Sequence, residues 1–273
     1  MSKKKSPTHN DLSVPERIAR AAAKTQRLVE HTIDLITLHE GNRIIVYSPA
    51  LAPQVTGTRA ATAFNYFQDA MMKYEIVRLC ALFNPCDPTD FDVESIPAVV
   101  AMIDHPDVLT ALMENTRREW LGSPGTRVYE QPNESAETKA LIAEAIKASE
   151  TEWADRQAAK AYRRLQNAVK WTKHLNTAPR VKSVRNLRDK HLAHSLERTR
   201  REKNEVIAPM KHGDQRRLLH KAIALVDALH HGVNRTGFDW SESVQIARRN
   251  AQALWGNCTF QIPDRRSHSH TAS

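Results

Sequence analysis

Residues 185–194 read Arg-Asn-Leu-Arg-Asp-Lys-His-Leu-Ala-His and combine two kinds of side chain that could act together on a phosphodiester. An arginine guanidinium keeps its charge and presents a planar fork of N–H donors that matches a phosphate group. A histidine can give or take a proton near neutral pH. Together they can cleave RNA without a metal. The ribose 2'-OH attacks the adjacent phosphorus, a histidine moves protons, and an arginine stabilises the charged phosphorane.

The spacing of these residues limits how they can meet. Arg188 and His194 are six positions apart, so on a regular α-helix of 3.6 residues per turn they do not share one face. Convergence therefore requires the long reach of arginine, a break in the helix, or a second copy of the motif. A two-fold homodimer would supply that second copy.

An alternative register lies three residues upstream. It pairs Arg185 with His191, and Asn186 follows its arginine directly. We favour the downstream register because Leu192-Ala193, just before its histidine, suits a buried helix face.

Residues 188–194 resemble the Arg-x(4–6)-His signature of the HEPN superfamily. The wider chain, roughly residues 15–255, resembles the abortive-infection AbiU-type branch of that superfamily. There a long aromatic-rich helix that ends in a Leu-Phe-Asn/Asp step precedes the motif, as residues 63–84 do here. A charged loop and a regular amphipathic helix follow the motif in that branch, matching residues 198–213 and 214–231.

The resemblance implies an all-α, HEPN-like helical bundle with long antiparallel helices, and a homodimer whose motifs face each other. It also implies a metal-independent endoribonuclease that leaves a 2',3'-cyclic phosphate. In this reading Arg188 and His194 are catalytic. In the family a polar residue usually follows the arginine, and here that residue is Asp189, which would orient Arg188 or the histidine of the other copy. Further residues are expected to support the site or bind substrate: Arg185, Asn186, Lys190 and His191.

Composition agrees with a helical protein. The chain has 273 residues, of which 41% are hydrophobic and 26% charged, and it contains only 8 glycines. This length suits one large domain or two small ones. With the resemblance, we expect a single HEPN-like helical domain over residues 13–256, preceded by a disordered basic stretch at 1–12 and followed by a disordered tail at 263–273. A net charge of +9 is compatible with RNA as the partner.

Cofactors, metals and membranes are not expected. The three cysteines, Cys80, Cys86 and Cys258, form no zinc-binding pattern, and no nucleotide-binding glycine motif is visible. An odd cysteine count without a signal peptide predicts reduced thiols in the cytoplasm. No apolar stretch reaches the roughly 18 residues that span a bilayer.

Apolar periodicity and capping signals predict where the helices lie. A Ser13–Glu16 capping box should open the first helix, which should end near His39 because Gly41 follows. A connecting segment with a short extended piece at 44–47 should come next. Further helices are expected over 58–83, 96–121 and 135–175, in the motif region after a cap at Ser183, over 214–231, and over 240–255. A common core is expected around Phe67, Tyr74, Leu165, Leu225 and Leu229.

A second hypothesis is that the protein is a binding module and not an enzyme. The positive charge and the amphipathic helices fit a non-catalytic helical module that binds RNA or protein equally well. A toxin of a toxin–antitoxin pair is a biological role that could be added to the ribonuclease reading, with an antitoxin or another regulatory protein as a partner. That role rests wholly on the resemblance.

Overall fold

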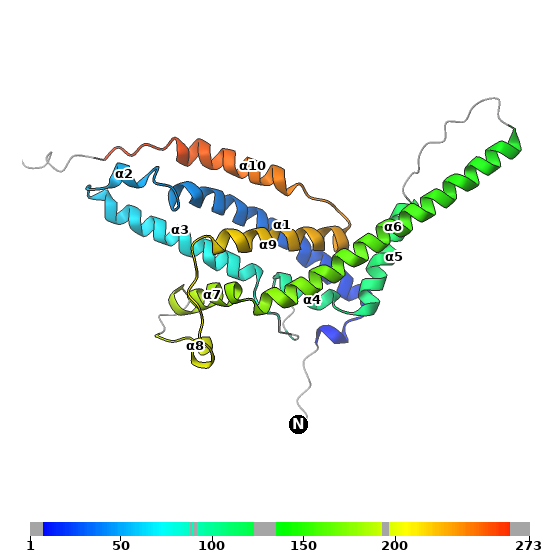
Figure 1. Ribbon diagram of the computed structural model, residues 1–273, viewed down its shortest axis with the longest axis horizontal. Helices are drawn as coiled ribbons and strands as arrows, with labels where there is room; N and C mark the ends of the chain where they lie inside the picture. The colour runs from blue at the N-terminus through cyan, green and yellow to red at the C-terminus, as the bar shows by residue number, and fades with distance from the viewer. Residues whose placement is uncertain (1–7, 88, 90–91, 123–134, 193–196, 263–273) are drawn as a thin grey trace, which may run out of the picture. The chain divides into compact units, whose positions relative to one another are not determined.

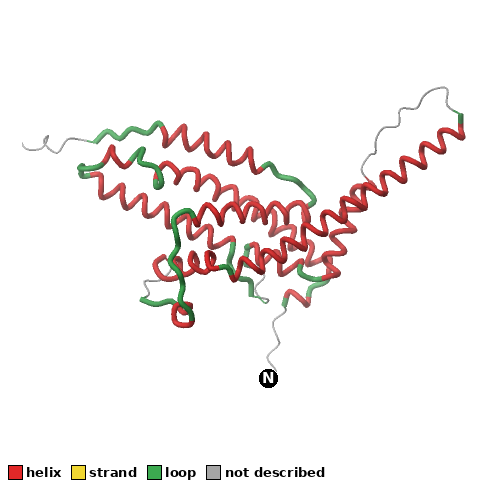
Figure 2. Tube along the Cα trace, viewed as in Figure 1, coloured by secondary structure: helices red, strands yellow, loops and turns green. Residues whose placement is uncertain are grey.

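The computed structural model describes residues 8–87, 89, 92–122, 135–192 and 197–262, and within these ranges every regular element is a helix (Figures 1 and 2). This confirms the all-α fold. The α-helices are α1 (Val14–Ile45), α2 (Ala52–Val55), α3 (Ala60–Leu82), α4 (Ile96–Ile103), α5 (Pro106–Gly122), α6 (Ala136–Thr177), α7 (Pro179–Leu187), α8 (Arg200–Asn204), α9 (Asp214–Leu229) and α10 (Trp240–Ala251). Short π-helical turns extend three of them: η2 (Arg188–Leu192), η3 (His230–Asn234) and η4 (Gln252–Gly256).

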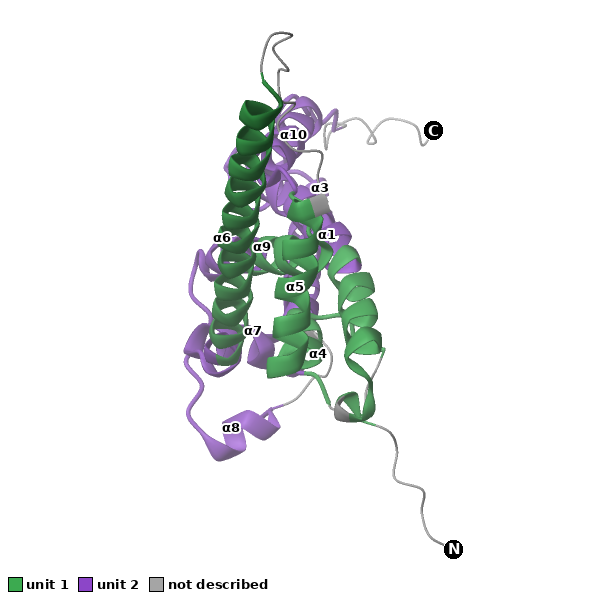
Figure 3. Cartoon of the chain, turned by 90° about the vertical axis from the view of Figure 1, so that its right-hand side faces the viewer, with its two compact units in different colours: residues 1–26, 86–173, 225–237 green, residues 27–85, 174–224, 238–273 purple. Residues whose placement is uncertain are grey.

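The chain divides into two compact units, coloured separately in Figure 3. Unit 1 contains residues 1–26, 86–173 and 225–237, and unit 2 contains residues 27–85, 174–224 and 238–273. The helices α1, α6 and α9 each contribute to both units. A single domain over 13–256 stays a prediction.

Unit 1 is held together by an apolar core and by a buried arginine. Leu165, Leu225 and Leu229, three of the predicted core residues, are at most 2% exposed. Arg17, which is also buried, donates from Nε to the carbonyl of Met102 at 2.7 Å, at the end of α4. A positive charge near the carbonyl end of a helix is favourable, because the last carbonyls carry partial negative charge.

A close helix approach in unit 1 depends on Gly232. A Cβ atom built there would lie 2.4 Å from Cδ2 and 2.5 Å from Cγ of Leu165, which is fully buried, so the leucine side chain would have to shift within the core. We therefore expect Gly232→Ala to lower the free energy of unfolding by about 1–3 kcal/mol, the usual cost of overpacking a core. Urea unfolding followed by circular dichroism would measure this.

The matched control is Gly41→Ala. Its Cβ would meet nothing closer than 3.9 Å, and Gly41 lies inside α1, where alanine is the better helix former by up to about 1 kcal/mol. The packing argument is wrong if Gly232→Ala leaves the unfolding midpoint unchanged or shifts it no further down than Gly41→Ala does.

Unit 2 is built on an antiparallel pair formed by α1 and α3. Three contacts give the register, because the residue numbers rise on one helix as they fall on the other. Asp34 pairs with Arg78, His39 with Glu75, and the carbonyl of Ile45 accepts from the side chain of Gln68. This arrangement agrees with the predicted antiparallel packing of long helices.

The first helix is longer than predicted. The capping box forms, with Glu16 accepting from both the backbone N–H and the hydroxyl of Ser13, but α1 continues through Gly41 to Ile45. The predicted stop at His39 and the extended piece at 44–47 are therefore wrong. Tertiary contacts explain the difference, because Asn42 is fully buried and donates to Glu75 and to the carbonyl of Met71.

Two predicted core residues are not in the core. Phe67 is 37% exposed and Tyr74 is 53% exposed, and they lie on α3 near exposed Tyr66 and Val77. Of the aromatic residues on this helix only Phe64 is buried, in a cluster with Ile45, Leu51 and Val55. Helical periodicity cannot tell an apolar face that packs within the chain from one left open, and here α3 carries both.

Other helix ends also differ in detail. Ser183 does not cap a helix but lies inside α7, where its hydroxyl lies 2.9 Å from the carbonyl of Pro179 and 2.6 Å from that of Ala208. The amphipathic helix α9 ends at Leu229, and Gly232 lies within the π-turn that follows. The other predicted helices, over 58–83, 96–121, 135–175 and 240–255, are present, the second of them as the pair α4 and α5.

Part of the expected disorder falls on residues that the structure does not describe, namely 1–7 and 263–273. Within the remaining N-terminal stretch, residues His9–Asp11 form a 3-10 turn that was not predicted. No single helix in the described ranges is long and apolar enough to cross a membrane, and only the bent pair α4–α5 reaches that threshold when taken together.

Candidate active site

The motif lies on α7 and on the π-turn η2 that continues it. Pro179 is well placed at the start of α7, because its fixed φ suits the first helical turn and its missing N–H would have no helical partner there. From Arg188 to Leu192 the backbone widens into η2. Such turns bond each residue to one five positions away and often occur at functional sites. The regular α-helix is thus broken at the first motif residue.

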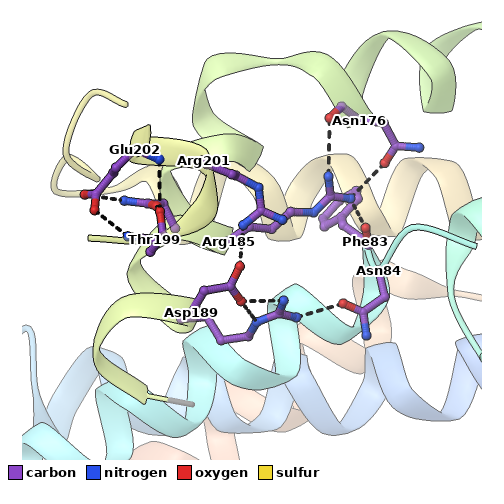
Figure 4. Close-up of polar contacts among 10 residues, drawn as sticks. Phe83, Asn84, Asn176, Arg185, Asp189, Thr199, Arg201 and Glu202 are labelled. Atoms are coloured by element: carbon purple, nitrogen blue, oxygen red, sulfur yellow. Dashed lines mark hydrogen bonds and ion pairs between the residues drawn. The ribbon is translucent and has the colours of Figure 1, made fainter. Parts of the chain in front are cut away.

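Arg185 is buried at the C-terminal end of α3 (Figure 4), with only 5% of its surface exposed. Its guanidinium donates to the carbonyl of Phe83 and, at 2.9 Å, to Oδ1 of Asn176. Burial lowers the pKa of Arg185 to about 10, and the nearby charge of Arg201 adds to this effect. Arg185 therefore remains charged at neutral pH and ties α7 to the end of α3.

Arg188 is more accessible, with 23% of its side chain exposed. Its Nε and Nη2 atoms donate to Oδ1 of Asp189 at 2.9 and 2.7 Å, and its Nη1 donates to Oδ1 of Asn84 at 2.8 Å. The second carboxylate oxygen of Asp189 is bound by Arg201. One carboxylate thus binds two arginines, Arg188 through one oxygen and Arg201 through the other. Figure 4 shows the contact between Asp189 and Arg201.

The two arginines that bind Asp189 keep its carboxylate ionised. Burial alone would raise the pKa of Asp189, but the hydrogen bonds and charges of Arg188 and Arg201 outweigh it and hold the pKa below its ordinary value. Asp189 is therefore ionised at neutral pH, and the three groups carry a net positive charge.

The charged run after the motif forms structure instead of a plain loop. The short helix α8 begins with a capping box in which Thr199 and Glu202 bond to each other's backbone N–H groups. Glu202 also accepts from Asn186 at 2.9 Å and from Lys190 at 3.2 Å. The backbone hydrogen bond from Thr199, followed by that from Asn186, lowers the pKa of Glu202 to about 2. Asn186, itself buried, thereby joins α7 to α8.

A cysteine beneath the arginines is not a nucleophile. Cys80 is 2% exposed, and burial raises the pKa of its thiol to about 11 against the opposing charges of Arg188 and Arg185. A protonated, inaccessible thiol is chemically inert.

A basic hollow of about 420 Å³ lies beside the beginning of α7. Its lining includes His174, Arg180, Lys211 and Lys221, with one carboxylate, Asp214, already bound to Arg180 at 3.0 Å. The cationic residues exceed the single acid, so this surface of unit 2 suits an anion.

The predicted site residues differ in how far the structure exposes them. It brings Arg188, Asp189 and Lys190 to a partly exposed surface, and it buries Arg185 and Asn186. His194 lies outside the described residues, and the side chain of His191 is likewise not described. Within the described ranges, no group of three or more His, Cys, Asp or Glu residues could hold a metal ion.

Sequence reasoning missed four residues that complete the cluster: Asn84, Asn176, Arg201 and Glu202. Asn84 is about a hundred positions from the motif, and although it ends the Leu-Phe-Asn step of residues 63–84, nothing in that step indicates its contact with Arg188. Glu202 left a signal in the sequence, because Thr-x-x-Glu at 199–202 is a capping-box pattern that indicates a helix start.

A comparison with protein families places the chain in a known family. The family model named HEPN_AbiU2, described as AbiU2, matches residues 18–254 of the chain. Searches of curated proteins and of solved structures found no match.

Proposed function

Because the chain belongs to the HEPN family of AbiU2 proteins, we propose that it is a metal-independent endoribonuclease. The observation that carries the proposal is the Arg188–Asp189 pair, which lies at a break in the motif helix in a protein of this family. An abortive-infection role, with the enzyme acting as a toxin, is the biological setting that this family suggests.

In the proposed reaction, His194 takes the proton of a ribose 2'-OH, and the 2'-oxygen attacks the adjacent phosphorus. The bond from phosphorus to the 5'-oxygen breaks, and a second histidine, His194 of the other copy in a dimer, protonates the leaving oxygen. The products are a 2',3'-cyclic phosphate and a 5'-hydroxyl. Arg188 stabilises the negative charge on the phosphorane oxygens.

The geometry of Arg188 supports this role. Its contacts with Asp189 and Asn84 use three of the five N–H donors of a guanidinium, so two remain for phosphate oxygens. Because both partners hold the fork in one orientation, little reorganisation is needed when charge develops in the transition state. Arg201, bound to the same carboxylate, adds a second positive charge beside the fork.

Arg185 and Asn186 receive a different role in this proposal. Both are buried and bound to protein groups, so we assign them to anchoring α7 rather than to touching RNA. Lys190, with 27% of its side chain exposed, keeps a supporting role near the phosphates. The basic hollow beside α7 would accept the RNA backbone further along the strand.

A homodimer is part of the proposal. The exposed apolar face of α3, made by Tyr66, Phe67, Tyr74 and Val77, is a patch of the kind that partners cover. The C-terminal end of the same helix contacts α7 and η2. A two-fold contact along α3 would therefore bring two motifs to one interface. Arg188 of one copy could then act with His194 of the other, although the two residues of one copy do not share a helix face.

One observation favours the alternative of a non-catalytic RNA- or protein-binding module. Asp189 already neutralises part of the charge of Arg188, as it would in a purely structural ion pair. The two readings differ in whether the protein turns over substrate.

The deciding experiment is cleavage of a mixed RNA by the purified protein, with and without EDTA. We expect endonucleolytic products with 2',3'-cyclic phosphate ends, at the same rate in both conditions, and a dimer by light scattering. Binding without any cleavage supports the module reading. Cleavage that EDTA abolishes refutes the metal-free mechanism, and an active monomer refutes the shared site.

A further inference from the structure

A second polar centre in unit 2 is formed by residues outside the motif. Glu75 of α3 is 1% exposed, and three residues of α1 and the segment after it surround its carboxylate. His39 approaches Oε1 with Nδ1 at 2.7 Å, Asn42 donates to Oε2 at 2.7 Å, and the hydroxyl of Tyr47 lies 3.4 Å from the same oxygen. Burial raises the pKa of Tyr47, and the charge of Glu75 adds to this effect, so the phenol stays protonated and can donate.

This arrangement orients His39 toward a cavity. Since Nδ1 faces Glu75, the opposite edge of the ring, with Nε2, is the part left for another group, as in carboxylate–histidine pairs generally. His39 and Tyr47 form one side of a cavity of about 270 Å³. Its remaining lining is Arg43, His212, Gly213, Gln215 and Arg216.

The lining of this cavity favours an anion. Two arginines and two histidines belong to it, and none of its lining residues is a carboxylate, although Arg43 also contacts Glu40 at 2.7 Å. Gly213 and Arg216 flank the first turn of α9, and the N-terminal end of a 16-residue helix carries partial positive charge. The turn into α9 depends on Gly213, whose φ of 80° is readily adopted only by glycine.

One amide of the cavity lining is available to a ligand. Gln215 is only 6% exposed as a residue and lines the cavity, and within the described residues its amide makes no hydrogen bond. The amide atoms themselves are not fully buried, so they can reach a group bound in the cavity. An amide offers two donors and an acceptor, which can bind the edge of a base or a sugar hydroxyl.

Two aromatic rings also line the cavity. Tyr47 and His212 meet edge to face, with ring centroids 6.1 Å apart, on the wall of the same cavity. Aromatic faces of this kind stack on nucleobases. We infer that this cavity, formed by α1, the segment that follows it and the start of α9, binds a nucleoside monophosphate. Arg43, Arg216 and the start of α9 would hold the phosphate, and Tyr47 and Gln215 would hold the base.

The test is calorimetric titration of the full-length protein with AMP, GMP, CMP and UMP, with inorganic phosphate and a short RNA as comparisons. At least one nucleotide should bind more tightly than phosphate. Arg216→Ala should weaken that binding about tenfold or more, as expected for a lost charged hydrogen bond. The matched control is Arg217→Ala, which removes the same charge one residue away at a position outside the cavity lining.

Two further variants test which residues hold the nucleotide. Gln215→Met keeps the side-chain length but removes the amide, so it should weaken nucleotide binding while leaving phosphate binding unchanged. Arg188→Ala should leave nucleotide binding intact, because the motif does not line this cavity. The inference fails if no mononucleotide binds, if the Arg216 and Arg217 variants behave alike, or if Arg188→Ala abolishes binding. Failure of RNA cleavage would leave these binding results unaffected.

Discussion

We expect Arg188→Ala and His194→Ala each to abolish RNA cleavage and to leave the fold and the dimer intact. Loss of one preorganised charge-stabilising donor typically costs about 10²–10³ in rate, and loss of one positioned proton transfer costs about 10²–10⁴. Arg188 is partly exposed and bound only to side chains, so its removal leaves no fully buried backbone group unpaired. The measurement is initial cleavage rate on one defined RNA, with circular dichroism and light scattering on the same samples.

Conservative variants distinguish the two roles. His194→Gln should fail, because glutamine can hydrogen-bond but cannot change its protonation state. Arg188→Lys should keep only a fraction of the rate, because a lysine keeps the charge but loses the planar fork that Asp189 and Asn84 orient. Asp189→Asn should give an intermediate loss, since the fork keeps an acceptor but loses its charged one.

His191→Ala is the internal comparison. Because it belongs to the upstream register, its effect should be milder than that of His194→Ala. If His191→Ala is inactive and His194→Ala is active, the catalytic register is Arg185–His191 and our assignment is wrong. If neither histidine matters, the protein does not cleave RNA by this chemistry, and the binding-module reading is correct.

Much of the helical framework could be predicted because its signals are local. The 42-residue helix α6 and the start of α9 at Asp214 follow from periodicity and capping alone. The motif itself was also visible, since its residues are adjacent in sequence. What local patterns cannot show is which helix face is covered, and this is why Phe67 and Tyr74 were wrongly placed in the core.

Long-range pairs account for the remaining differences. Gly41 is a helix-stop signal in isolation, but the contact of the next residue, Asn42, with Glu75 helps hold the helix together beyond it. The same carboxylate organises His39, which is 36 positions away in sequence, so the second cavity had no sequence signature. The partners of Arg185 also lie outside the motif, because Phe83 is 102 positions away and Asn176 is nine positions away. The sequence of the motif alone therefore favoured a phosphate contact for Arg185.

Replacing Arg185, the arginine of the upstream register, should have the second large effect, which is on stability instead of rate. Arg185→Ala should lower the free energy of unfolding by about 2–4 kcal/mol, because each buried polar group left without a partner costs about 1–3 kcal/mol. The groups affected are the carbonyl of Phe83 and both side-chain and backbone oxygens of Asn176. For a chain of this size the melting temperature should fall by roughly 5–15 °C.

The comparison of Arg185→Ala with Arg188→Ala tests whether Arg185 anchors the motif helix while Arg188 acts in the reaction. The same substitution, three residues apart on one motif, should mainly destabilise the protein at Arg185 and mainly slow the reaction at Arg188. Cleavage by the Arg185 variant should be measured well below its melting temperature, where the protein is still folded. Its rate should then fall by no more than about 10²-fold, which is the usual cost of a displaced site. A fully stable but inactive Arg185→Ala protein would contradict the anchoring role and move the catalytic arginine to position 185.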